Sequence, residues 1–250
     1  MKKKFLIINW NYKNILLLNI KDMSNNDLSI DIDYESNKDK WIYKDKGCSN
    51  LNTNDGCLKS LFDLVQHSHN CYSYMLNIIH PEILKECQKN IYNKTKNNNL
   101  NILKDSDRCR YMWKQPGYYA NISKSEPKLE YTCPNLVEKV LKDFPNIIHI
   151  DKIKHNNNII KCQDNTNLEK CQCPKGYRKG ALVVSPGRTF HFYRKDKGNI
   201  WSHKDGSYTP SLVDSVGNRV SDPQTCNRKY SNVEYSDFCG YFCIPDNLKY

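Results

Sequence analysis

Three short apolar runs in the C-terminal half of the chain predict a meander of antiparallel strands. They cover residues 181–184, 190–194 and 200–203, and the linkers between them are rich in Pro, Gly, Asn and Lys. Apolar runs of this length, bounded by turn-forming residues, are typical of strands that pack in a core. The pattern places two histidines, His191 and His203, on neighbouring strands of this meander.

Apolar residues at helical spacing predict helices upstream of the meander. Positions 72, 75, 76 and 79 are apolar or aromatic, and Asn70 is a suitable N-cap, which puts Cys71 in the first turn. Residues 133–144 form the clearest amphipathic pattern, with Pro134 in the first turn and Pro145 as the stop. Together these patterns predict an α+β fold in which N-terminal helices pack on a small antiparallel sheet.

Composition divides the chain into an appendage and one larger domain. Residues 1–46 alternate short apolar runs with acidic and Asn-rich patches, and residues 47–250 hold the predicted helices and strands, with a low-complexity insertion around 90–101. The basic start followed by Phe-Leu-Ile-Ile resembles a signal peptide, but polar residues interrupt it, so we interpret it as an uncleaved strand or tail. No stretch approaches the roughly 18 apolar residues of a membrane span, so we expect a soluble protein.

The positive charge favours anionic partners. The 250 residues carry a formal net charge of +11, which indicates contact with an anionic polymer through a basic surface. The alternative explanation of this net charge is a lysine-rich composition that results from AT-rich codons. No arginine-rich run or nucleic-acid motif is present, so a nucleic-acid-associated protein is only a third alternative.

Twelve cysteines are many for a protein kept in a reducing compartment. Their even number permits complete pairing, whereas one catalytic cysteine would leave an odd number. Cys171 and Cys173, with Cys162 or His155, form either a zinc site or disulfides; the spacing is not a common zinc pattern, and we expect no metal and no cofactor. Cys239 and Cys243 are interpreted as structural.

Cys71 is the candidate nucleophile. The partial positive charge of a helix N-terminus favours a thiolate, so its position predicts a lowered thiol pKa. A histidine on a strand is then the expected proton acceptor, and a polar residue on the next strand would orient it. The alternative for Cys71 is a buried structural cysteine or one half of a disulfide.

These residues carry a resemblance to a known enzyme group. Asn70-Cys71-Tyr72 at the start of a helix, His191 in Phe-His-Phe-Tyr and His203 in Trp-Ser-His resemble the NlpC/P60 and CHAP group of papain-like cysteine peptidases and amidases. The resemblance covers about half of the chain and implies a papain-like fold with insertions. It implies Cys71 as nucleophile, His191 as general base and His203 as orienting residue, acting on a peptide or an amide-containing substrate.

Four further residues are candidates for substrate binding. Asn70 and Tyr72 flank the candidate nucleophile, and Trp113 and Trp201 lie in aromatic-rich segments that either line a groove or belong to the core. Separately, the segments 181–188, 201–204 and 238–243 resemble signatures of an uncharacterised family found in microbes and large DNA viruses, a resemblance that implies no particular function.

The sequence therefore predicts a cysteine hydrolase of peptide or amide bonds. The alternative is a non-catalytic, disulfide-stabilised structural or binding protein, such as a virion or secreted component. The cytoplasm or a virion is favoured over secretion as its location.

Overall fold

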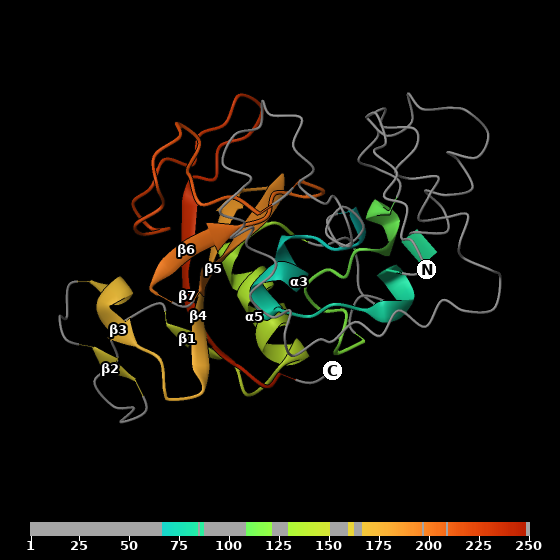
Figure 1. Cartoon of the computed structure of the whole chain (residues 1–250), viewed down its shortest axis with the longest axis horizontal. Coiled ribbons are helices and arrows are strands. Elements are labelled where there is room, and N and C mark those ends of the chain that lie inside the picture. Colours follow the sequence, from blue (N-terminus) through green and yellow to red (C-terminus); the bar gives the residue numbers. More distant parts are fainter. Residues whose placement is uncertain are drawn as a thin grey trace, which may run out of the picture.

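The structure is a computed structural model of the chain, shown in Figure 1. The residues that it describes are 67–84, 86–87, 109–121, 130–150, 160–162, 167–196, 198–208 and 210–248. The predicted appendage at 1–46 and the insertion around 90–101 lie outside these residues.

A five-stranded antiparallel sheet forms the centre of the described fold. Its strand order is β1-β7-β4-β5-β6, and every ladder in it is antiparallel. The strands are β1 (Ile148–Ile150), β4 (Tyr177–Ser185), β5 (Thr189–Asp196), β6 (Ile200–His203) and β7 (Asp237–Pro245). A separate two-stranded sheet joins β2 (Lys161–Cys162) to β3 (Cys171–Gln172).

The predicted meander is confirmed, and β4 and β5 are longer than their apolar runs, whereas β6 has the predicted bounds. The β4–β5 ladder continues from Gly180 opposite Arg194 to Ser185 opposite Thr189, and the turn between them contains Gly187 at a φ of 69°. This left-handed conformation suits glycine because it has no side chain. The polar start of β4 is a strand because it pairs with β7, where Arg178 lies opposite Ile244.

Strand β7 occupies an interior position in the sheet. It pairs with β1 on one side and with β4 on the other, so this late segment joins β1 to the meander. Its register with β4 shifts between Leu182 and Val183, close to Gly240 at a φ of 109°. No local pattern in the sequence places this segment inside the sheet.

Two α-helices cover one face of the sheet (Figure 1). Helix α5 (Cys133–Asp143) confirms the predicted amphipathic helix, with proline in its first turn. Helix α3 (Cys71–Leu76) begins as predicted after Asn70 but ends early, because Asn77 adopts a left-handed conformation and its N–H bonds the carbonyls of Ser73 and Tyr74. Short 3-10 helices cover Arg110–Met112 (η3) and Leu168–Lys170 (η5).

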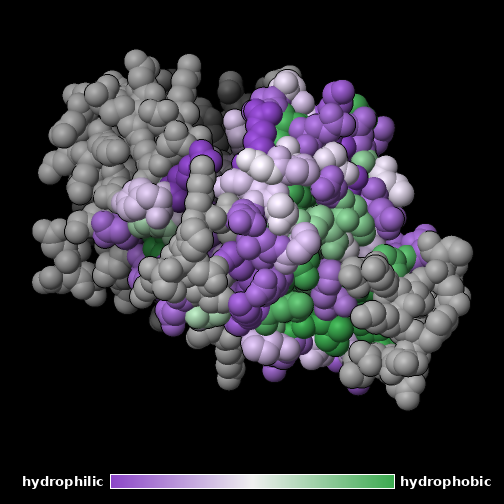
Figure 2. Space-filling view, turned by 180° about the vertical axis from the view of Figure 1, so that it is seen from behind, coloured by the Kyte–Doolittle hydropathy of each residue, from purple (hydrophilic) through white to green (hydrophobic). Residues whose placement is uncertain are grey.

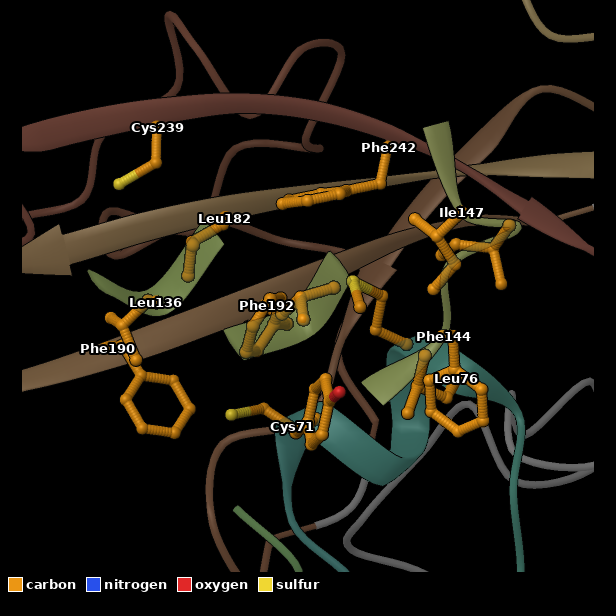
Figure 3. Packing of buried hydrophobic residues seen from close by; sticks show 14 of the residues in the cluster. Cys71, Leu76, Leu136, Phe144, Ile147, Leu182, Phe190, Phe192, Cys239 and Phe242 are labelled. Carbon is orange, nitrogen blue, oxygen red and sulfur yellow. The ribbon is translucent and has the colours of Figure 1, made fainter. Parts of the chain in front are cut away.

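The core between the helices and the sheet is apolar and buried. Figure 3 shows Leu76, Leu136 and Phe144 from the helical side facing Leu182, Phe192 and Phe242 from the strands. Cys71 belongs to this cluster and lies near Phe190 in the same layer (Figure 3). Helix α3 is therefore held by hydrophobic burial, which is the main source of stability for a helix this short.

The other face of the sheet has its own core. Ala181, Val183 and Tyr193 pack there with Trp201 and with Tyr241. Because successive strand residues point to opposite faces, Val183 and Tyr193 belong to this cluster whereas Val184 and Phe192 belong to the first. The segment between β6 and β7 adds Val220 and Tyr235.

Three disulfides connect distant parts of the described chain. They join Cys87 to Cys109, Cys133 to Cys239 and Cys173 to Cys243. The last two attach β7 to helix α5 and to the segment after β3, respectively. Cys239 and Cys243 are thus structural, as predicted.

Hydrophilic residues cover much of the face of the described surface that is seen in Figure 2. Figure 2 shows one face on which hydrophilic residues interrupt smaller groups of hydrophobic ones. The large hydrophobic side chains with high exposure are Tyr111, Tyr208, Val213 and Val216. No helix among the described residues is long and apolar enough to cross a membrane.

Candidate functional site

The candidate nucleophile lies at the first residue of helix α3. Asn70 caps this helix because its side-chain oxygen accepts a hydrogen bond from the Ser73 N–H at 3.1 Å. The Asn70 amide nitrogen also donates to the carbonyl of Lys114 at 2.9 Å. Asn70 therefore fixes the helix start and attaches it to the segment after η3, and both of these contacts are structural.

Burial controls the state of the Cys71 thiol. Only 6% of the residue is exposed, and removal from water raises the pKa of the Cys71 thiol to about 12. A hydrogen bond with the backbone of Phe192 and the charge of Lys204 lower this pKa, but by less. The predicted lowering at the helix start is therefore wrong, because the cost of desolvation exceeds the effect of a six-residue helix.

His191 and His203 lie together as their spacing suggested. His191 Nε2 is 2.9 Å from His203 Nδ1, and His203 Nε2 is 2.8 Å from the carbonyl oxygen of Val213. Both rings are buried, and burial lowers the pKa of each imidazole, that of His191 well below its ordinary value. Both are therefore neutral near pH 7.

The carbonyl of Val213 fixes the tautomer of both rings. A carbonyl oxygen can only accept, so His203 Nε2 carries the proton and its Nδ1 accepts from His191 Nε2. The neutral His191 ring then carries its proton on Nε2. Its Nδ1 is consequently a lone pair, the form that a proton acceptor requires.

The Cys71 thiol bonds the residue next to His191, not the His191 ring. The thiol bonds the backbone of Phe192, the residue that follows His191 in β5. The His191 ring lies against Tyr193 and Tyr235, with ring centroids 5.3 and 5.5 Å apart. In the part of the chain that the structure describes, no hydrogen bond joins the Cys71 sulfur to His191. Strand alternation explains this separation, because the side chains flanking His191 in β5 point to the Cys71 side.

Lys204, which no sequence pattern indicated, lies beside the start of helix α3. Its side chain is fully buried, and its ammonium donates to the carbonyl of His69 at 2.6 Å and to the carbonyl of Gly206. Burial lowers the pKa of Lys204 to about 7, against the opposing effect of Cys71. Lysines are rarely buried, and adjacency to His203 is the one feature of the sequence that could have indicated it.

The four candidate substrate-binding residues occupy different environments. Tyr72 is fully buried, and its hydroxyl donates to the Asp143 carboxylate at 2.8 Å, while Trp201 is buried in the second core cluster. Trp113 donates its indole N–H to the carbonyl of His67 at 2.9 Å and lies close to Gly206. Of the four, Trp113 is the residue that is partly exposed beside the loop after His203, and substrate contact stays a prediction for all of them.

The cysteines that suggested a zinc site form disulfides instead. Cys173 is bonded to Cys243, and Cys171 is also disulfide-bonded, so neither offers a thiolate to a metal. No group of three or more metal-ligating side chains is found among the described residues. Cys71 and Cys226 are the free cysteines of the described chain, so the disulfide that would exclude Cys71 as a nucleophile does not form.

Comparison with known proteins gives one partial similarity. A stretch of 64 residues is 44% identical to insoluble matrix shell protein 1 of Ruditapes philippinarum. The match covers 26% of this chain and 40% of the shell protein, so the chain spans well under half of that relative. No family model matches the chain, and no solved structure is significantly similar to it.

Proposed function

We propose that this protein is a disulfide-stabilised structural or binding component of an extracellular or particle-bound matrix. The observation that carries this proposal is the set of three disulfides, two of which attach the interior strand β7 to other parts of the fold. Covalent links of this kind persist in oxidising environments and are rare in the cytosol. They weigh against the cytoplasmic location that the sequence analysis favoured.

The partial similarity points in the same direction. The relative is named as an insoluble matrix shell protein, and a protein that functions within an insoluble matrix needs a fold that survives outside the cell. The basic composition, with a formal net charge of +11, suits contact with an anionic matrix polymer. The candidate polymer is an acidic one, since long-range attraction depends on opposite charge.

Fractionation of the native source tests the matrix proposal. Intact material is alkylated under non-reducing conditions, separated into soluble and insoluble fractions, and analysed for cross-linked peptides by mass spectrometry. We expect the Cys133–Cys239 and Cys173–Cys243 peptides to be linked and enriched in the insoluble fraction. Fully reduced protein in the soluble intracellular fraction would contradict the proposal.

A pair of matched variants separates the fold from the thiol. Cys71→Ser removes a free cysteine, whereas Cys239→Ser removes a disulfide. Under the matrix proposal, Cys71→Ser protein is retained in the insoluble fraction like the wild type, and Cys239→Ser protein is lost to degradation or to the soluble fraction.

A cysteine hydrolase is the second candidate, and the hydrogen bonds that fix the tautomers of His191 and His203 favour it. The contacts from the Val213 carbonyl through His203 to His191 leave a lone pair on His191 Nδ1. In such an enzyme, the Cys71 thiol would give its proton to His191 Nδ1 and the sulfur would attack a carbonyl carbon, whose oxygen takes the electron pair. The carbon–nitrogen bond would then break, and the protonated His191, held by His203, would give its proton to the leaving amine. Contacts of this kind often form only when substrate binds.

Thiol labelling with iodoacetamide, read by peptide mass spectrometry, tests the hydrolase candidate. If His191 activates the thiol, Cys71 is alkylated faster than Cys226 near pH 7. The His191→Ala variant should then label Cys71 at least tenfold more slowly than the wild type. His149→Ala is the matched control, because His149 bonds the carbonyl of Cys239 instead. Slow labelling of Cys71 that does not depend on His191 would rule the candidate out.

A further inference from the structure

A polar cavity lies away from Cys71, at the C-terminal end of helix α3. Its volume is about 960 Å³, and its walls include Asn77 from the helix cap, the start of β4 and the end of β5. Asn77 follows the last residue of α3, whereas Cys71 is its first. The cavity is therefore separate from the candidate nucleophile.

Basic side chains outnumber acidic ones in the walls of this cavity. Five cationic residues and three carboxylates line it: Lys170, Arg178, Lys179, Arg194 and Lys195, with Glu169, Asp196 and Asp246. The excess of positive charge attracts an anion into a space where burial reduces screening by solvent.

The three carboxylates are already paired with cavity cations. Asp196 accepts from Arg194 Nε at 2.8 Å, Glu169 accepts from Lys195 at 2.5 Å, and Asp246 lies 3.5 Å from Arg178. Lys179, in contrast, donates to the backbone carbonyls of Glu169 and Cys171. Carbonyls satisfy its N–H groups without neutralising its charge, so positive charge remains in the cavity.

Each arginine of the cavity keeps a buried donor without an acceptor. Arg194 is 2% exposed, and neither its Nη2 nor the Nε of Arg178 bonds any acceptor among the described residues. Buried donors of a guanidinium are costly to leave unsatisfied. An oxyanion supplies several acceptor oxygens at once and matches the planar geometry of guanidinium groups.

The two guanidinium groups also lie close enough to repel each other. Burial and the charge of Arg194 together lower the pKa of Arg178 to about 10. Two like charges in a buried space are stabilised when a counter-charge lies between them. Asp246 and Asp196 oppose this repulsion, and an oxyanion beside both guanidinium groups would reduce it further.

Capping of helix α3 explains part of this arrangement. Arg178 Nη2 donates to the carbonyl of Leu76 at 2.5 Å, and Arg194 Nη1 donates to the carbonyl of Tyr74 at 3.2 Å. Cations at a helix C-terminus are stabilising. Capping uses these nitrogens and leaves Arg194 Nη2 and Arg178 Nε for another acceptor.

We propose that this cavity binds one oxyanion, a phosphate, sulfate or carboxylate group, between Arg178 and Arg194. Lys179 supplies further positive charge from the wall. The site does not depend on Cys71 or on a matrix role, so it stands or fails separately from the proposed function.

Isothermal titration calorimetry with simple anions tests this site. Inorganic phosphate, sulfate and acetate are titrated separately into the full-length protein at constant ionic strength, because salt screens such contacts. We expect saturable binding with one site for at least one of them, and the preferred probe identifies the chemical group. Absence of saturable binding by all three would overturn the proposal.

Arginine variants locate the binding. Arg178→Met should weaken binding tenfold or more, as expected for the loss of charge-assisted hydrogen bonds. Arg188→Met is the matched control, because Arg188 is exposed in the β4–β5 turn and removes the same charge elsewhere. Equal weakening in both variants would show a general charge effect and contradict the site.

Crystallography covers the case in which Arg178→Met does not fold. Crystals of the wild-type protein grown with selenate, an analogue of sulfate, should show an anomalous peak beside Arg178 and Arg194. Peaks confined to surface lysines would overturn the proposal.

Discussion

Burial favours the neutral form of three titratable groups near the start of helix α3, Cys71, His191 and Lys204. It raises the pKa of the Cys71 thiol to about 12, lowers that of Lys204 to about 7 and lowers that of His191. The thiol and the imidazole are therefore uncharged near pH 7. An ion pair of the kind that activates a cysteine forms here only if substrate or a structural change alters the exposure of these groups.

Lys204 should make stability depend on pH. Its folded pKa lies near 7, below the ordinary value of 10.5, so between these values the unfolded chain binds a proton that the folded chain does not. Stability should therefore rise as pH increases above 7, by up to about 1.4 kcal/mol per pH unit from this residue. Urea unfolding at several pH values between 7 and 8.5 measures this slope.

The Lys204→Met variant isolates this contribution. Lys179 has a pKa lowered to about 8 and acts in the same direction, so the variant should keep part of the slope and lose the part due to Lys204. An unchanged slope in Lys204→Met would show that the ammonium is not desolvated as described.

Close packing of helix α3 on strand β4 depends on Gly180. A β-carbon at this position would lie 2.8 Å from Met75 Cγ and 2.8 Å from Ile244 Cδ1. Both neighbours are fully buried and have little room to move. Gly180→Ala should therefore destabilise the protein by about 1–3 kcal/mol, as overpacking of a core does, measured by denaturant unfolding.

A double-mutant cycle tests the cause of that loss. In a Met75→Ala background the space beside Gly180 is larger, so Gly180→Ala should cost less there than in the wild type. An equal cost in both backgrounds would indicate a backbone effect instead of a steric one.

Local sequence patterns predicted the helices and strands whose formation depends on neighbouring residues. The meander, helix α5 and the Asn70 cap follow from apolar spacing, turn residues and capping chemistry. The polar start of β4 and the interior place of β7 depend on pairing between residues more than 50 positions apart, which no local window contains. The early end of α3 depends on the left-handed Asn77.

For the candidate site, the sequence predicted one side-chain contact but not the burial of the charged residues. The spacing of His191 and His203 across a hairpin correctly indicated their contact. The buried positions of Lys204 and Arg194 were not predicted, because charged residues are expected at the surface. The predicted direction of the Cys71 pKa shift was wrong, because the sequence does not show how deeply the thiol is buried.

The disulfides should contribute unequally to stability. Cys133–Cys239 spans 106 positions and Cys87–Cys109 spans 22, and a longer loop restricts the unfolded chain more. Replacing both cysteines of the long loop by serine should cost about 4–5 kcal/mol, against about 3 kcal/mol for the short loop. Unfolding of the two double variants in guanidinium measures the difference, and a larger loss for the short loop would contradict this expectation.

The interior position of β7 also sets the order in which the protein can fold during synthesis. Strand β1 has β7 as its sheet neighbour, so it leaves the ribosome well before a pairing partner exists. During that interval its edge and that of β4 are open to other chains. Productive folding therefore waits until residues 237–245 emerge, and a chaperone that shields β4 over this interval should raise the yield of native protein.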